Sequence, residues 1–193
     1  MKLVATGSQT VGPFYHFALN RPEWSDLTRN GAKGEKIRIE GRVLDGDGAP
    51  CIDAFLEIWQ ANAAGKYNHP DDKQHKDIDA GFIGFGRALC DAEGRYAFTT
   101  ISPGRVPGRG NALQAPHINV ALFARGLLKH LCTRIYFADR ADANADDPVL
   151  GAVADAKARA TLLAKPGQGA DGIKTYRFDV ILQGKGETAF FDV

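Results

Sequence analysis

The sequence lacks an apolar run of the roughly 20 residues that a membrane-spanning helix requires. Its start, MKLVATGSQTVGPFYHF, holds one lysine and only a short, broken apolar patch, which argues against a secretory signal. Charge of one sign is not in excess either, because the formal net charge is +1. Neither a nucleic acid nor a membrane surface is therefore expected as a partner. These absences predict a soluble cytoplasmic protein.

Cysteine is also scarce. The three cysteines, Cys51, Cys90 and Cys132, are odd in number and include no CxxC spacing. They predict small apolar side chains in a reducing cytoplasm rather than disulfides or a zinc site. Glycine, in contrast, is plentiful at 22 residues, which favours tight turns and short strands over long helices. Since there is no repeat or low-complexity linker, residues 1–193 are predicted to form one domain.

Alternating apolar and polar residues, separated by turn residues, predict a set of β-strands. In KIRIEGRVLD (36–45), Ile37, Ile39 and Val43 alternate with charged residues, and the DGDG that follows is a turn signal. Five further segments are interpreted as strands: 53–61, 95–101, 117–124, 133–138 and 174–182. The pattern predicts a mainly β fold, an antiparallel β-sandwich with long loops.

One short helix is predicted after the strands of the central region. Asp147 can cap it, Pro148 suits its first turn, and VLGAVADAKARATLLA (149–164) follows with apolar residues near helical spacing. Residues 1–35 are predicted to be irregular, because glycine and proline breakers recur there. The tail, 183–193, ends in two adjacent phenylalanines and a valine and is predicted to pack against the domain.

The segment QAPHIN, residues 114–119, suggests half of a metal site. His117 and Asn119 lie two residues apart in a run that is interpreted as a strand, so alternation places both side chains on one face. That geometry suits two ligands of one metal ion, yet an amide is a far poorer ligand than imidazole for a transition metal. A buried histidine that is simply hydrogen-bonded in the core is the competing interpretation.

Seven segments of the chain together carry a specific pattern. They are SQTVGPFYH, EGRVLDGDGAPCIDAFLEIWQANAAGKY (40–67), FGRALCDAEGRYAFTTISPG, QAPHINVALFARG, LCTRIYFAD, DPVL and YRFDVILQGKGETAFFDV. This pattern resembles the intradiol ring-cleavage dioxygenases, non-haem iron(III) enzymes that open catechols between the two hydroxyl groups. The resemblance covers nearly the whole chain and implies the β-sandwich fold of that family.

In that family two tyrosinates and two histidines hold the iron, because hard anionic phenolates stabilise the ferric state and imidazoles complete the site. The resemblance places the first tyrosine on Tyr67 and the first histidine on His117. Val106, in SPGRVPG, takes the place of the second tyrosine, and Asn119 that of the second histidine. Val106 offers no lone pair and the Asn119 amide is neutral and weak. No iron is therefore expected at these four vestigial ligand positions.

Such a loss of ligands resembles the non-metal alpha chain of two-chain family members, whose homologous beta chain carries the complete set. The resemblance implies Fe(3+) bound by a beta partner, alpha-beta units in a larger oligomer, and 3,4-dihydroxybenzoate and O2 as substrates. It further implies that segment 1–35 contacts the partner and that Thr10, Gly12, Pro13 and Arg125 bind substrate. Arg125 would also act in catalysis by offering positive charge and hydrogen-bond donors to an anionic ring.

Other interpretations of the same residues remain open. Arg125 would also suit an ordinary ion-paired strand end, and Tyr67 a structural role or a polar cluster with His69 and His117. A self-sufficient intradiol enzyme would use Tyr67 and His117 with His69 or His16 as substitute ligands. A non-catalytic sandwich that binds small molecules or partners is the third alternative.

The spacing along one strand separates two of the candidate residues. If residues 117–125 are fully extended, His117 and Arg125 lie roughly 26 Å apart, at about 3.3 Å per residue. Arg125 is therefore expected to serve a neighbouring chain's pocket rather than the vestigial positions of its own chain. The polar run DDKQHKD (71–77) is expected to be a solvated loop rather than a metal site.

Overall fold

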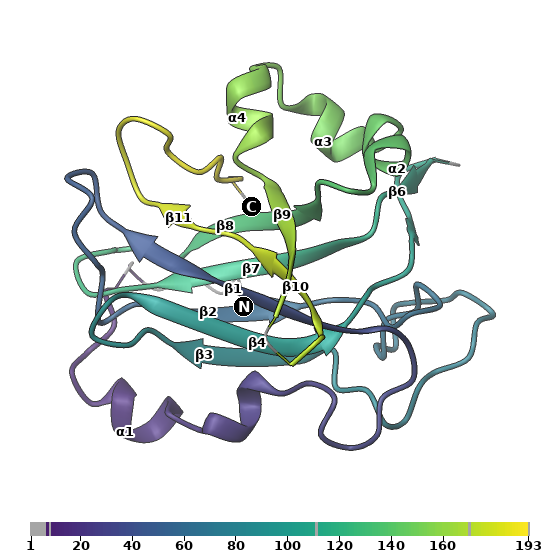
Figure 1. Cartoon of the computed structure of the whole chain (residues 1–193), viewed down its shortest axis with the longest axis horizontal. Coiled ribbons are helices and arrows are strands. Elements are labelled where there is room, and N and C mark those ends of the chain that lie inside the picture. The colour runs from purple at the N-terminus through teal and green to yellow at the C-terminus, as the bar shows by residue number, and fades with distance from the viewer. Residues whose placement is uncertain (1–6, 8, 111, 170, 193) are drawn as a thin grey trace, which may run out of the picture.

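The computed structural model describes residues 7, 9–110, 112–169 and 171–192 (Figure 1). The strands are β1 (Lys36–Leu44), β2 (Phe55–Trp59), β3 (Phe85–Leu89), β4 (Arg95–Ile101), β5 (Val106–Pro107), β6 (Leu113–Gln114), β7 (His117–Phe123), β8 (Leu131–Phe137), β9 (Leu163–Gln168), β10 (Lys174–Arg177) and β11 (Val180–Ile181). The helices are α1 (Tyr15–Leu19), the 3-10 helix η1 (Pro22–Ser25), α2 (Ala141–Ala145), α3 (Pro148–Ala152) and α4 (Ala156–Ala160). The predicted mainly β fold is confirmed.

Nine of the strands join into one mixed sheet rather than an antiparallel sandwich, and β5 and β6 pair separately. Its order is β11-β1-β10-β9-β8-β7-β2-β3, and β4 pairs with the other edge of β1. β1 runs parallel to β10 and β11, and β8 runs parallel to β9, which the predicted antiparallel arrangement does not allow. The sheet curls until β3 and β4, at its two ends, contact each other (Figure 1). The architecture is therefore close to a barrel.

The core lies inside this curled sheet and follows the alternation of the sequence. Ile37, Ile39 and Val43 of β1 are fully buried, as are Ile118 and Leu122 of β7. Because successive side chains of a strand point to opposite faces, the residues that alternate with these core residues point away from the core. His117 and Asn119 are among those residues, so β7 presents them on the outer face of the sheet.

The predicted single helix is wrong in its extent. Asp147 does cap a helix, since its carboxylate accepts hydrogen bonds from Val149 N and Leu150 N, but α3 ends at Ala152. The chain becomes extended at Val153, and Asp155 then caps a separate helix, α4, by accepting from Lys157 N. Residues 163 and 164, which were predicted to end the helix, instead begin β9.

Two further boundaries differ from the predictions. The predicted strand 174–182 is interrupted at Phe178, where Phe178 N donates to Glu40 O. β1 can approach there because residue 41 is glycine: a Cβ at Gly41 would lie 1.8 Å from Phe178 O. The segment 1–35, predicted as irregular, contains α1 and η1. β3 and β9 were not predicted, because β3 contains a glycine and an arginine and β9 a Pro-Gly pair.

The tail packs against the sheet as predicted, through the last described residue, Asp192. Phe191 N donates to Cys132 O at 2.8 Å, and Thr133 Oγ1 donates to Ala189 O at 2.8 Å. The three cysteines are free thiols and are half-buried. No helix in the described ranges combines the length and the apolar character needed to cross a membrane.

Candidate functional site

The outer face of the sheet carries His117 and Asn119, two of the four positions that the resemblance predicted as former iron ligands. Asn119 of β7 lies directly opposite Trp59 of β2 on one side and Arg134 of β8 on the other. Directly opposed residues of antiparallel strands point to the same face, so these three side chains form one row. One step along β7, His117 lies opposite Tyr136 of β8. This pairing brings an aromatic, an amide, an imidazole and a guanidinium onto one surface.

Tyr67 joins this surface from the loop that follows β2. Its ring stacks on Trp59, with ring centroids 5.7 Å apart and an interplanar angle of 16°. Asn119 Nδ2 donates to Tyr67 Oη at 3.4 Å and to Trp59 O at 3.3 Å. Burial raises the pKa of Tyr67, although the hydrogen bond from Asn119 and the charge of Arg134 act against that rise. Tyr67 is therefore a protonated phenol at neutral pH.

His117 is buried and neutral. Its side chain is 3% exposed, and Nδ1 donates to Ala115 O at 2.8 Å, since a carbonyl can only accept. Burial and the nearby charge of Arg134 lower its pKa to about 4, against the smaller raising effects of Ala115 O and Asp147. The ring lies beside Tyr136, with centroids 5.8 Å apart. These contacts agree with the competing interpretation of a hydrogen-bonded core histidine.

The residues present do not fit a ferric ion. Val106, in β5, is buried and offers only a methyl surface, and Asn119 turns its NH2 group, which has no lone pair to give, toward Tyr67. Only Tyr67 and His117 carry donor atoms that suit iron(III). Across the described residues, no group of three or more His, Cys, Asp or Glu side chains is arranged to hold a metal.

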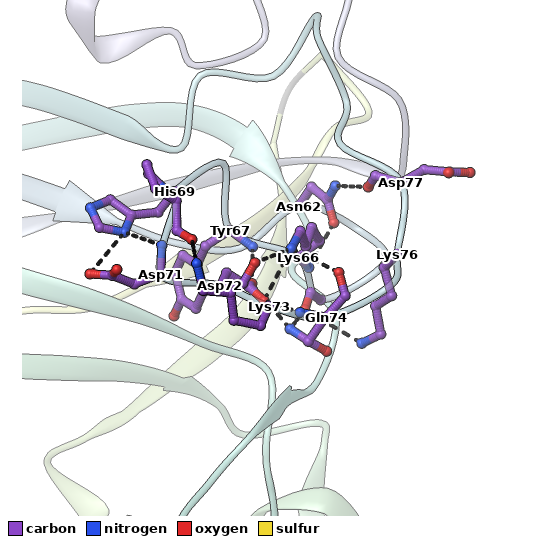
Figure 2. Close-up of polar contacts among 12 residues, drawn as sticks. Asn62, Lys66, Tyr67, His69, Asp71, Asp72, Lys73, Gln74, Lys76 and Asp77 are labelled. Atoms are coloured by element: carbon purple, nitrogen blue, oxygen red, sulfur yellow. Dashed lines mark hydrogen bonds and ion pairs between the residues drawn. The ribbon is translucent and has the colours of Figure 1, made fainter.

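The proposed substitute ligands lie elsewhere or cannot be placed. His69 is exposed and accepts a hydrogen bond from Asp71 N at 3.2 Å (Figure 2). The side chain of His69 thus interacts with Asp71 in its own loop. Figure 2 shows no hydrogen bond or ion pair between His69 and Tyr67. The side chain of His16 lies outside what the structure describes.

A buried lysine organises the loop that carries Tyr67 (Figure 2). Lys66 Nζ donates to Asp72 O and to Gln74 O, and it lies 3.2 Å from the Asp72 carboxylate. Asp72 Oδ2 in turn accepts from Tyr67 N at 2.8 Å. The run 71–77 is mostly exposed, as predicted. The contacts of Lys66 and Asp72 nevertheless anchor this loop and fix the backbone position of Tyr67.

A second cluster forms at the opposite end of β7. Thr10 Oγ1 accepts a hydrogen bond from Gly126 N at 2.9 Å and lies 3.5 Å from Ala124 O. The N-terminal segment is thereby held against the turn that presents Arg125. The side chain of Arg125 is 78% exposed, and its Nε lies 2.9 Å from Asp53 Oδ2.

Gly12 and Pro13 continue this segment on the surface. Both are exposed, and Gly12 O accepts from Tyr15 N at 3.3 Å at the start of α1. A Cβ at Gly12 would meet no atom of the described residues within 4 Å, so none of these residues requires a glycine there. If a close approach to position 12 requires glycine, the approaching group lies outside the described residues.

Tyr15 fastens α1 to the sheet and was not predicted to matter. Its hydroxyl donates to the backbone carbonyl of Asp53, and its ring packs on Phe55 at a centroid distance of 5.1 Å. Burial, followed by the charge of Asp53, raises the pKa of Tyr15 to about 12. Asp53 thus contacts both Tyr15 and Arg125, and the one sequence signal for this link is an acidic residue at the start of the predicted strand 53–61.

The structure therefore separates the candidate residues into two groups. Tyr67, His117 and Asn119 gather near the start of β7, and Thr10 and Arg125 gather beyond its end. The uninterrupted strand between them agrees with the predicted separation of His117 from Arg125.

Comparison with known proteins places the chain in a family. The family profile described as Dioxygenase matches residues 11–184. The protocatechuate 3,4-dioxygenase alpha chain of Pseudomonas putida is 41% identical over 201 residues, covering 98% of this chain and 97% of that relative. The beta chain of Burkholderia cepacia is 37% identical over 192 residues, covering 94% of this chain and 77% of that relative.

The fold agrees with solved structures of the same class. The dioxygenase domain of a carbohydrate-binding fusion protein from Streptomyces sp. SirexAA-E has a TM-score of 0.58 at 24% identity, covering 86% of this chain and 88% of that one. The chain belongs to the intradiol ring-cleavage dioxygenase family. Within that family it is similar over almost its full length to alpha chains of protocatechuate 3,4-dioxygenase.

Proposed function

We propose that this chain is the non-metal alpha chain of a two-chain protocatechuate 3,4-dioxygenase. The complex would cleave 3,4-dihydroxybenzoate with O2 to 3-carboxy-cis,cis-muconate at an iron(III) held by a homologous beta chain. One observation supports the proposal: this member of the family has Val106 and Asn119 at two positions where the resemblance predicts iron ligands. The similarity to both an alpha and a beta chain supports a common ancestor for the two partners.

This chain would act by completing the substrate pocket of its partner. The iron, when bound by the beta chain, supplies the oxidative ring opening. Arg125 presents an exposed guanidinium that can donate hydrogen bonds to an anionic catechol or carboxylate, and Asp53 orients it. Thr10 fixes the segment that brings Gly12 and Pro13 to the same surface. Gly12 has open space on this chain, which suits close contact with a flat ring.

An apolar surface next to this cluster supports contact with a partner. Phe14 and Phe17, at the start of α1, are strongly exposed, and their ring centroids are 6.4 Å apart. Large apolar side chains gathered on a surface are typical of protein interfaces. We therefore assign the segment 1–35 to the alpha-beta contact. Assembly of such alpha-beta units into a larger oligomer is part of the same proposal.

The proposal is tested by expressing the chain alone and together with its beta partner. Metal analysis should find iron only in the complex, and ring cleavage, followed by loss of substrate absorbance, should require both chains. Stoichiometric iron in the isolated chain, with ring cleavage, would favour the self-sufficient enzyme and overturn the proposal.

A substitution distinguishes a pocket residue from a binding module without a catalytic part. In the complex, Arg125→Ala should lower kcat/KM roughly ten- to a hundredfold, the loss expected for one hydrogen bond to a charged group. Arg125→Lys should recover part of it, because the charge is kept but the planar donor pair is lost. Arg95→Ala, which removes an exposed arginine paired with Glu93 at 3.5 Å, is the matched control. Unchanged turnover in Arg125→Ala and after deletion of residues 1–14 would support the non-catalytic alternative.

A further inference from the structure

Arg134 projects onto the same face as the vestigial ligand positions. It lies directly across from Asn119 in the β7–β8 register, and its neighbour on the same strand face, Tyr136, lies across from His117. Side chains of directly opposed residues begin about 5 Å apart. Asn119 itself contacts Tyr67. The guanidinium of Arg134 therefore lies beside the point at which side chains at positions 67, 117 and 119 would converge on a metal ion.

The charge of Arg134 is not neutralised by a carboxylate. Its Nη1 donates to Gln114 Oε1 at 2.7 Å and to Tyr136 Oη at 3.4 Å, and both partners are neutral. Within the described part of the chain, no carboxylate forms an ion pair with Arg134. Asp147 accepts from Tyr136 Oη at 3.2 Å and from backbone N–H groups, and it forms no ion pair with Arg134 among the described residues. A permanent positive charge thus remains on this surface.

Part of this surface is accessible from outside. A hollow of about 430 Å³ reaches Trp59, Asn119 and Arg134 and is otherwise lined largely by apolar side chains. Its two carboxylates among the described residues, those of Glu57 and Asp192, are paired with Arg87 and Lys129 and not with Arg134. A small ion could enter it without displacing the chain. The hollow thus gives access to Asn119 and Arg134, whereas His117 is only 3% exposed.

We propose that Arg134 closes the vestigial ligand positions to metal ions by holding a fixed positive charge beside them. The inference rests on the proposed assignment of those positions and adds a separate barrier to the missing ligands. At a separation of roughly 6 Å, the repulsion between a divalent cation and one unit charge weakens binding about tenfold even at the dielectric constant of water. Restoring ligands alone would then leave a poor metal site.

Cobalt(II) binding to the full-length chain tests this inference, with Co2+ absorption and metal content as readouts. Asn119→His provides a second imidazole beside His117 and Tyr67, a three-ligand set of a kind that first-row metals accept. This variant is compared with Asn119→His/Arg134→Gln, in which the charge is removed. Asn119→His/Arg134→Lys is the matched control, because it changes the shape but keeps the charge. Urea unfolding confirms that each variant folds, and Asn119→His/Arg134→Met is a second neutral variant.

The expected result is about tenfold or more tighter Co2+ binding in the Gln and Met variants than in Asn119→His alone, with no gain in the Lys variant. The difference should shrink at high salt, since exposed charges are screened. Equal affinity in the neutral variants and in Asn119→His, or an equal gain in the Lys variant, overturns the inference. Neither outcome bears on the alpha-chain proposal, which fails only if the unaltered chain holds catalytic iron.

Discussion

Replacement of Asp147 should show how one buried carboxylate ties three parts of the fold together. The residue is 2% exposed. Its Oδ1 accepts from Val149 N and Leu150 N, both at 2.8 Å, and from Tyr136 Oη at 3.2 Å. Its Oδ2 accepts from Ala115 N at 2.6 Å. Asp147 thus caps α3, holds β8, and fixes the chain just before His117.

The magnitude follows from these bonds. Asp147→Ala removes a helix cap, which costs about 0.5–2 kcal/mol. It also leaves Ala115 N–H and the Tyr136 hydroxyl unpaired in the interior, at about 1–3 kcal/mol each. Because such terms are not additive, the expected loss in the free energy of unfolding is about 3–5 kcal/mol. Asp147→Asn keeps one acceptor oxygen and should lose about half as much.

Asp155→Ala provides a matched control within the same segment. Asp155 caps α4 in the same way, but it is exposed, and among the described residues its carboxylate accepts only from Lys157 N. Its loss should cost about 0.5–1 kcal/mol. Urea unfolding followed by circular dichroism measures both. If the two alanine variants lose equal stability with equal m-values, the reasoning from buried hydrogen bonds is refuted.

Two further predictions concern the backbone and the acid response. Gly41→Ala should cost about 3 kcal/mol or prevent folding, because its methyl would lie 1.8 Å from a carbonyl oxygen of the neighbouring strand. Gly151→Ala, with open space around it in α3, should stabilise by about 0.5–1 kcal/mol, and a similar response at both sites would contradict the steric argument. Burial raises the pKa of Asp72, but hydrogen bonds from two backbone N–H groups and from Lys66 outweigh this and lower it to about 2. Since the pKa is lower in the folded state, its contribution to stability is present above about pH 4 and is lost as the pH falls toward 2. Unfolding free energies across that range should depend less on pH in Asp72→Asn, whereas Asp71→Asn, at an exposed site, should behave as the unaltered chain.

Local chemistry made part of the structure predictable. Strict alternation in 36–45 and 117–124 gave both the strands and the residues that face the core. The cap at Asp147 was also predictable, because an Asp-Pro pair suits the first turn of a helix. The second cap at Asp155, inside a run of helix-favouring residues, was not recognised, so the helix was predicted too long.

The sequence by itself determined which chemical groups are present, and the family resemblance predicts from them that the iron ligands are incomplete at Val106 and Asn119. Only the tertiary structure decided which groups meet. Alternation specifies the face on which a side chain lies, but the partner strand and its register depend on hydrogen bonds between distant segments. The row Trp59–Asn119–Arg134 and the contact of Thr10 with Gly126 both arise in that way. They bring together residues from separate strands and from opposite ends of the chain, whose proximity no local pattern encodes.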